Sequence, residues 1–209
     1  MNLLAHLHLS AAHSAGVAAG NLLADFLRRT GAAPPDAEFA AGVRLHRAID
    51  AFADAHPALR AARAGFEPPW RRWSGILIDV ACDHFLTCAW ARHCAVPLRD
   101  HVAARLDEIH AHLAPRSAPL AALVARLRAE EWLLACGTCA ELGRIFERLA
   151  RRTPAAAALR GAEREIERRR ATLQTAFDEF YPQARARFGA PLGPAESLRF
   201  PAAAARSST

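Results

Sequence analysis

Apolar residues recur along this chain with the spacing of helix faces. Leu22, Leu23, Phe26 and Leu27, for example, form one apolar stripe within residues 14–29. No segment shows sustained alternation of apolar and polar residues rich in β-branched side chains, so we expect no sheet. The pattern predicts helices over residues 14–29, 36–55, 57–65, 70–94, 98–113, 120–136, 139–151 and 155–187. The chain is therefore predicted to be all-α, a single-domain helical bundle.

Proline and glycine mark several ends of these segments. Gly31 and Pro34-Pro35 end the first helix, and Asp36 begins the second. At 209 residues, the chain is long enough to bury a substantial core within one domain. From residue 189 onwards the composition changes to Pro, Ala, Ser and Arg. We expect a helical domain over residues 1–188 and a disordered or loosely docked tail over residues 189–209.

The chain carries a net positive charge, and its basic residues are all arginine. The 27 Lys and Arg residues include no lysine, and with 21 acidic residues they give a net charge of +6. Arginine keeps its charge and binds carboxylate or phosphate through two hydrogen bonds. This indicates an acidic partner or substrate, although a GC-rich genome would produce the same excess.

Cysteine usage and hydropathy indicate the compartment. The five cysteines are odd in number and scattered through helical segments, unlike a disulfide framework. Cys136 and Cys139 have C-x-x-C spacing, but no second pair follows, and we interpret them as two ordinary thiols rather than a zinc or redox site. The sequence shows no signal peptide and no apolar run approaching about 18 residues. We expect a cytoplasmic protein without a membrane partner.

Four polar clusters interrupt the apolar helical pattern. They are His6 and His8; Asn21 and Asp25; His46, Arg47 and Asp50; and Asp79, Asp83 and His84. Each of the last three contains two polar residues four positions apart, which share one helical face. An unpaired polar group is costly to bury, and imidazole and carboxylate are ligands of Zn, Mn, Fe or Mg. The pattern predicts a shared divalent cation and metal-assisted chemistry on phosphate.

Each cluster also has a structural interpretation. A single N-terminal histidine is more often a buried side chain bonded to a carboxylate than a catalytic group. His46 and Asp50 could form a surface pair one turn apart, which contributes little stability. Asp83 is harder to explain in this way because apolar residues flank its cluster. His6 and His8 would share one side of an extended segment, but a helix would direct them to different sides.

The same clusters carry a family resemblance. Residues 2–9 (NLLAHLHL), 20–26 (GNLLADF), 46–50 (HRAID) and 79–86 (DVACDHFL) match it in order and separation, with weaker agreement at residues 131–133 and 180–182. Together they resemble the bacterial acyl carrier protein phosphodiesterase family over about residues 1–188. The resemblance implies a divergent helical member of the HD phosphohydrolase superfamily, although the adjacent pair Asp83-His84 reverses the usual order. It also implies removal of 4′-phosphopantetheine from holo acyl carrier protein, with manganese as the preferred metal.

A mechanism built on this resemblance assigns roles to the clusters. The metal would be held by some subset of His6, Asp25, His46, Asp50, Asp83 and His84. It would activate a water molecule and polarise a phosphoryl oxygen. His8 or His84 would protonate the leaving serine oxygen, Arg47 would neutralise phosphoryl charge, and Asn21 would position substrate or a ligand carboxylate. The arginines expected to steer the acidic carrier protein are Arg28, Arg29, Arg44, Arg71 and Arg72.

Two other functions stay open for this sequence. The same site could hydrolyse a nucleotide or another small phosphate ester, because a fold family sets only a prior for the substrate. Alternatively, the chain could be a non-catalytic helical adaptor that binds acidic protein or nucleic acid through arginine. The adaptor hypothesis leaves the acid pairs unexplained and lacks interleaved exposed aromatic residues, so we expect no nucleic-acid partner.

Overall fold

The computed structural model describes residues 3–190, which form one helical domain without strands, as predicted. The helices are α1 (Leu3–Leu9), α2 (Ala15–Thr30), α3 (Ala37–Ala55), α4 (Pro57–Ala64), α5 (Ser74–Cys88), α6 (Trp90–His93), α7 (Leu98–Leu113), α8 (Ala118–Ala129), α9 (Cys139–Ala150), α10 (Ala162–Arg168) and α11 (Arg170–Phe188), with 3₁₀ turns η1 (Arg71–Trp73) and η2 (Ala155–Leu159). The predicted tail beyond residue 190 lies outside the described residues. No helix in the described part is both long and apolar enough to cross a membrane.

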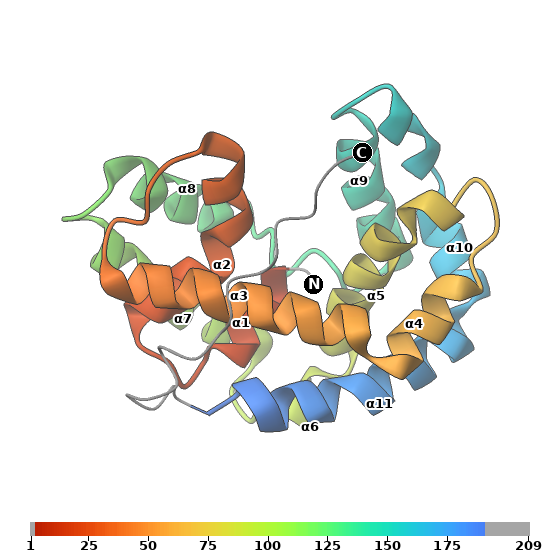
Figure 1. The fold of residues 1–209 in the computed structure, drawn as a ribbon, viewed down its shortest axis with the longest axis horizontal. Helices are drawn as coiled ribbons and strands as arrows, with labels where there is room; N and C mark the ends of the chain where they lie inside the picture. Colours follow the sequence, from red (N-terminus) through yellow and green to blue (C-terminus); the bar gives the residue numbers. More distant parts are fainter. Residues whose placement is uncertain (1–2, 191–209) are drawn as a thin grey trace.

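Helix α3 crosses the middle of the molecule in front of α1 (Figure 1). In this view α2, α7 and α8 lie to one side, and α4, α5, α9 and α10 lie to the other. The short helix α1 is the centre of the core, and Leu4, Leu7 and Leu9 are fully buried. Its neighbours are α2, α5 and α11. Polar side chains on α1 are therefore forced to find partners inside the protein.

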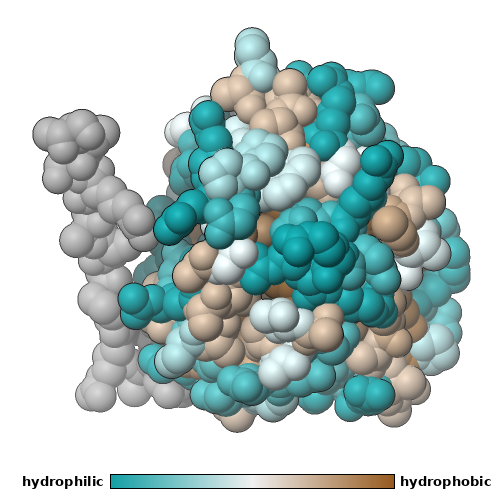
Figure 2. Space-filling view, turned by 90° about the vertical axis from the view of Figure 1, so that its right-hand side faces the viewer, coloured by the Kyte–Doolittle hydropathy of each residue, from teal (hydrophilic) through white to brown (hydrophobic). Residues whose placement is uncertain are grey.

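The outer surface is mainly hydrophilic. Figure 2 shows the side of the molecule that carries α4, α5 and α10 in Figure 1, where hydrophilic residues cover much of the surface and apolar patches are small. Among the described residues, Val96 is the only exposed large apolar residue, with 48% of its surface accessible. The apolar faces of the amphipathic helices are thus buried by packing within the domain.

Three long predicted helices are interrupted in the structure. The segment predicted at residues 70–94 divides into η1, α5 and α6, with a break at Ala89. The segment at 120–136 ends early because Glu131 has a φ of 50°, which a helix cannot accommodate. The segment at 155–187 divides into η2, α10 and α11, and Gly161 adopts a left-handed conformation (φ 80°) before α10.

Helices α2 and α3 approach each other unusually closely through two glycines. A Cβ atom at Gly20 would lie 2.0 Å from the carbonyl oxygen of Phe39, and one at Gly42 would lie 2.1 Å from the carbonyl oxygen of Val17. Only glycine permits this backbone contact. The contact brings Asn21, next to Gly20, against the helix that carries His46.

Asp36 fixes the start of α3 and ties it to α7. Its carboxylate accepts a hydrogen bond from the Phe39 N–H (2.8 Å) and lies 2.8 Å from His112 Nε2 and 3.1 Å from Arg116 Nε. Burial alone would raise the pKa of Asp36, but the Phe39 hydrogen bond and the charges of His112 and Arg116 outweigh it and lower the pKa. The ionised carboxylate therefore stabilises the folded state.

Replacing Asp36 with alanine is expected to lower the free energy of unfolding by about 1–2 kcal/mol, the usual cost of losing an N-cap. Urea denaturation measures this loss. Because the folded pKa lies below the unfolded value, the difference from wild type should be complete at neutral pH and shrink as the pH falls below about 3.8. Asp36→Asn, which keeps a capping oxygen, should lose less. An unchanged unfolding midpoint for Asp36→Ala would contradict this role.

Candidate metal centre

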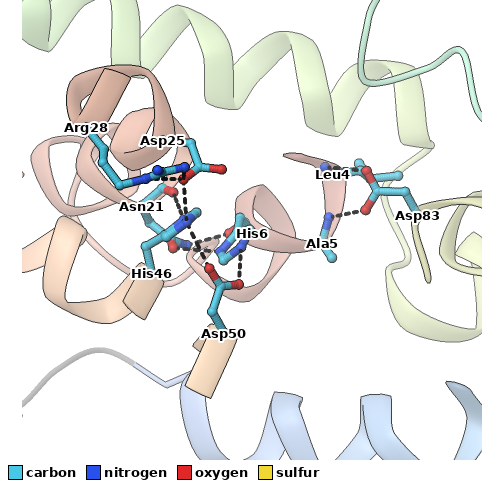
Figure 3. A network of polar contacts seen from close by, with 9 residues as sticks. All are labelled: Leu4, Ala5, His6, Asn21, Asp25, Arg28, His46, Asp50 and Asp83. Carbon is cyan, nitrogen blue, oxygen red and sulfur yellow. Dashed lines mark hydrogen bonds and ion pairs between the residues drawn. The ribbon is translucent and has the colours of Figure 1, made fainter. Parts of the chain in front are cut away.

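Two helices, α1 and α3, bring two imidazoles and a carboxylate together (Figure 3). His6 of α1 and His46 of α3 stack with ring centroids 4.0 Å apart. Their Nε2 atoms lie 3.3 and 3.1 Å from the two carboxylate oxygens of Asp50, which is also on α3. One ligand atom from each of these three residues lies within 4.8 Å of the others. This is the only such group of potential metal ligands among the described residues.

Asn21 orients both imidazole rings from α2. Its side-chain Nδ2 donates to the backbone carbonyl of His6 (2.7 Å), which leaves Oδ1 to accept a hydrogen bond from His6 Nδ1 (2.9 Å). The backbone carbonyl of Asn21 accepts from His46 Nδ1 (2.8 Å). Because oxygen acceptors require a proton on each Nδ1, Nε2 is the atom of each ring that is left to bind a cation, and both Nε2 atoms face Asp50. Second-sphere bonds of this kind commonly hold histidine ligands of metals.

Electrostatics favour a cation at this position. The two Nε2 atoms are buried and form no hydrogen bond of good geometry, although they face the Asp50 carboxylate. Burial, and then the charge of His46, lower the pKa of His6 to about 4, so its ring is neutral at physiological pH. Two lone pairs facing a carboxylate fit a divalent cation.

The cluster is open to solvent on one side. His6 and His46 are buried, whereas the side chain of Asp50 is 37% exposed and that of Asp25 is 58% exposed. Asp25 lies at the rim, with its Oδ1 4.0 Å from His46 Nε2 and 3.1 Å from Nη2 of Arg28. Burial raises the pKa of Asp79, and the charge of Asp50 adds to this increase, which places Asp79 near the same cluster. A ligand can therefore reach the cluster from the side of the two rim carboxylates.

Asp83, a predicted metal ligand, is engaged elsewhere. Its two oxygens accept hydrogen bonds from the backbone N–H groups of Leu4 (3.0 Å) and Ala5 (2.9 Å), and Figure 3 shows it apart from the His6 cluster. Burial raises the pKa of Asp83 to about 7, against the opposing effect of these two bonds. The carboxyl group caps the first turn of α1, whose N–H groups need acceptors. The structure therefore does not bring Asp83 to the metal cluster.

His84, predicted both as a ligand and as a proton donor, also has other partners. Its Nδ1 donates to the carbonyl oxygen of Cys136 (2.6 Å), and its Nε2 lies 3.1 Å from Nη1 of Arg170, which can only donate. Both ring nitrogens thus have partners, Nδ1 in the segment after α8 and Nε2 in α11. These contacts do not include the metal cluster, and the role of His84 stays a prediction.

His8 points to a different side of α1 from His6, as expected if the N-terminal segment is helical. Its Nδ1 lies 2.7 Å from the hydroxyl of Tyr181. Burial, followed by the charge of Arg185, lowers the pKa of His8 to about 3. A ring with this pKa is not in its imidazolium form at neutral pH, and the structure therefore gives no support to His8 as a general acid.

Arg47 and the unpredicted Arg152 add positive charge to the surroundings of the cluster. Arg47 follows His46 on α3, is exposed and forms no salt bridge with another described residue. Burial and the charge of Arg29 lower the pKa of Arg152, whereas the charge of Asp25 raises it. Arg152 is thus electrostatically coupled to the rim residue Asp25, although it follows α9 far along the sequence. No local pattern could have identified it.

The two cysteines with C-x-x-C spacing form no comparable site. Cys136 is buried, Cys139 is exposed, and both are free thiols, as are the other three cysteines. Neither belongs to a metal-ligating group among the described residues.

Comparison with known proteins gives a consistent result over most of the chain. The family model for acyl carrier protein phosphodiesterase matches residues 1–184. Relatives named acyl carrier protein phosphodiesterase include one from Yersinia pestis, 37% identical over 87% of this chain and 94% of the relative. Those from Serratia proteamaculans (35% identity; 88% and 95% coverage) and Photorhabdus laumondii (34% identity; 87% and 92% coverage) are similar. No solved structure matches the chain significantly.

Proposed function

Because the chain belongs to the acyl carrier protein phosphodiesterase family, we propose that it hydrolyses the phosphodiester between 4′-phosphopantetheine and a serine of holo acyl carrier protein. The products are apo acyl carrier protein and 4′-phosphopantetheine. The observation that carries this proposal is the convergence of His6, His46 and Asp50 with both Nε2 atoms facing one carboxylate. The five free cysteines fit a reducing cytoplasm as the place of the reaction.

The three residues of the cluster fit a divalent cation. His6 and His46 would bind it through Nε2 and Asp50 through a carboxylate oxygen, with Asp25 close enough to His46 to join after a small side-chain rotation. We propose Mn²⁺, which accepts imidazole and carboxylate ligands and is the metal implied by the family resemblance. When bound, the cation supplies positive charge to a phosphoryl oxygen and makes water a better nucleophile.

The chain's own residues prepare the site for this chemistry. Asn21 holds the protons on Nδ1 of His6 and His46, so that neither ring needs to reorient during catalysis. Arg47, exposed and one residue beyond His46, binds the phosphoryl oxygens through its guanidinium group. The buried floor of the cluster excludes water from the side of α1, so substrate approaches over Asp25 and Asp50.

The arginine excess fits an acidic protein substrate. Basic side chains at the rim raise the rate of encounter with an acidic carrier protein by electrostatic steering. Arg28 pairs with the rim residue Asp25 (3.1 Å). Charge reversal at Arg28 would therefore disturb the rim of the metal cluster as well as docking. Arg71 and Arg72, which are exposed on η1, are better positions for testing docking alone.

Intact-mass measurement of holo acyl carrier protein tests the proposed reaction. Incubation with the purified protein and Mn²⁺ should lower the mass of the carrier protein by that of the phosphopantetheinyl group, because the serine–phosphate bond is cleaved. A carrier protein that already lacks the group is the control and should keep its mass. If small phosphate esters are hydrolysed while the holo protein is unchanged, the site belongs to a small-molecule phosphohydrolase instead.

A further inference from the structure

A cavity lies beside α1, next to His8 and apart from the metal cluster. Its volume is about 570 Å³, and its walls come from α1 and the turn after it, α6 and the end of α11. Small-molecule sites commonly have volumes of about 300–1,000 Å³. His6 and His8 are two positions apart on a helix, about 200° around its axis. The cavity therefore opens on a different side of α1 from the metal cluster.

The charged groups at this cavity are all basic. Arg92, His93 and Arg185 line it together with His8, and no aspartate or glutamate is among the described residues of its wall. Neither arginine forms a salt bridge with another described residue. Arg63, by contrast, pairs with Asp54 at 2.7 Å. Two exposed guanidinium groups therefore share one cavity without an acidic partner.

The charges of both guanidinium groups lower the pKa of the His93 ring. After burial, the charge of Arg185 contributes most to lowering the pKa of His93, and Arg92 lowers it further. The acid that opposes them is Asp178, which accepts a hydrogen bond from Gln174 (3.0 Å) and does not line the cavity. Because both arginines line the same cavity, their positive charges repel each other unless an anion is bound.

Contacts with two aromatic residues hold His8, which forms the floor of the cavity. His8 is 8% exposed, and its Nδ1 is hydrogen-bonded to the hydroxyl of Tyr181, which is fully buried. The edge of the His8 ring also packs against Trp90, with ring centroids 4.9 Å apart. Tyr181 and Trp90 thus hold the buried His8 ring in place at the cavity wall. The floor of the proposed site is therefore in place without a ligand.

We propose that this cavity binds the phosphate group of a small molecule at a site separate from the metal cluster. Guanidinium groups bind phosphate through paired hydrogen bonds. A phosphate monoester carries up to two negative charges and so matches two arginines, whereas a carboxylate carries one. The proposal does not depend on the proposed phosphodiesterase reaction, because none of the metal-binding residues lines the cavity.

Isothermal titration of the metal-stripped full-length protein with inorganic phosphate and with phenyl phosphate, at constant ionic strength, tests this site. Arg92→Gln and Arg185→Gln should each weaken binding of both probes by at least about tenfold, the usual effect of losing a charge-assisted hydrogen bond. The matched control is Arg187→Gln, on the same helix, because Arg187 lies over the ring of Phe52 and does not line the cavity. It should bind both probes as wild type does.

Two further measurements distinguish phosphate binding in this cavity from binding at the metal cluster and from nonspecific attraction of anions. Asp50→Ala, which removes a residue of the metal cluster, should leave phosphate affinity unchanged. Acetate should bind at least about tenfold more weakly than phosphate, because it offers one charge to two arginines. The proposal is overturned if Arg187→Gln weakens binding as much as the cavity variants do, if Asp50→Ala alone abolishes binding, or if acetate binds as tightly as phosphate.

Discussion

Replacing Asp50 with alanine should lower kcat/KM on holo acyl carrier protein by at least about 100-fold and reduce the metal bound per chain, since even outer-shell partners of metal ligands cost about 10- to 100-fold. Asp50 is the one residue whose two oxygens face both imidazoles, at 3.3 and 3.1 Å. Without it, the two rings keep their positions through Asn21 but lose the negative charge that balances a cation. Steady-state kinetics and elemental analysis on the same preparation measure both effects.

Asp54→Ala is the matched control for this variant. Asp54 lies one turn further along α3, is partly exposed and pairs with Arg63 at 2.7 Å, outside the cluster. Its loss should leave metal content and kcat/KM close to wild type, because a surface pair contributes little. Equal losses in Asp50→Ala and Asp54→Ala would indicate a general effect on α3. An Asp50→Ala protein with full metal content and activity would exclude the proposed centre.

Replacing Gly42 with alanine should lower the free energy of unfolding by about 3 kcal/mol or more, because the cost of overpacking outweighs the gain in helix propensity. The added Cβ would lie 2.1 Å from the carbonyl oxygen of Val17 and 2.7 Å from the backbone nitrogen of Asn21. These are backbone atoms, so α2 and α3 must move apart. Chemical denaturation measures the loss in stability.

The same variant should impair the metal centre in the fraction that folds. Separating α2 from α3 lengthens the 2.8 Å bond between the Asn21 carbonyl and His46 Nδ1, which fixes the orientation of the His46 ring. Gly75→Ala is the control, because a Cβ there meets no atom within 4 Å. It should be neutral or slightly stabilising. Stability unchanged by Gly42→Ala would show that the two helices do not depend on this close contact.

Helices with clear caps and apolar stripes could be predicted from the sequence. Residues 36–55 were predicted as one helix, and α3 spans Ala37–Ala55 with Asp36 as its cap. Helix α1 could not be predicted with the same ease, because its seven residues depend on a cap that comes from Asp83, 79 positions away from Leu4. The break at Glu131 was missed for a similar reason, since a positive φ at a residue other than glycine has no sequence signal.

The candidate site was predictable only in part. The spacing of His46 and Asp50 indicated a shared face, and the structure does bring them together with His6. Asp79 and Asp83 show the same spacing, yet the Asp83 carboxylate meets backbone N–H groups instead. A buried acid needs a partner, but the local pattern does not distinguish a metal from a helix end. The orienting role of Asn21 towards two histidines likewise depends on the packing of α1, α2 and α3.

The most direct measurement of the central claim is the rate at which metal-stripped protein converts holo to apo acyl carrier protein as Mn²⁺ is added back. A centre formed by His6, His46 and Asp50 predicts no conversion in the stripped protein and full activity at about one bound cation per chain. Conversion at the full rate after stripping, with metal absent by elemental analysis, would contradict the claim that this cluster is the hydrolytic metal centre.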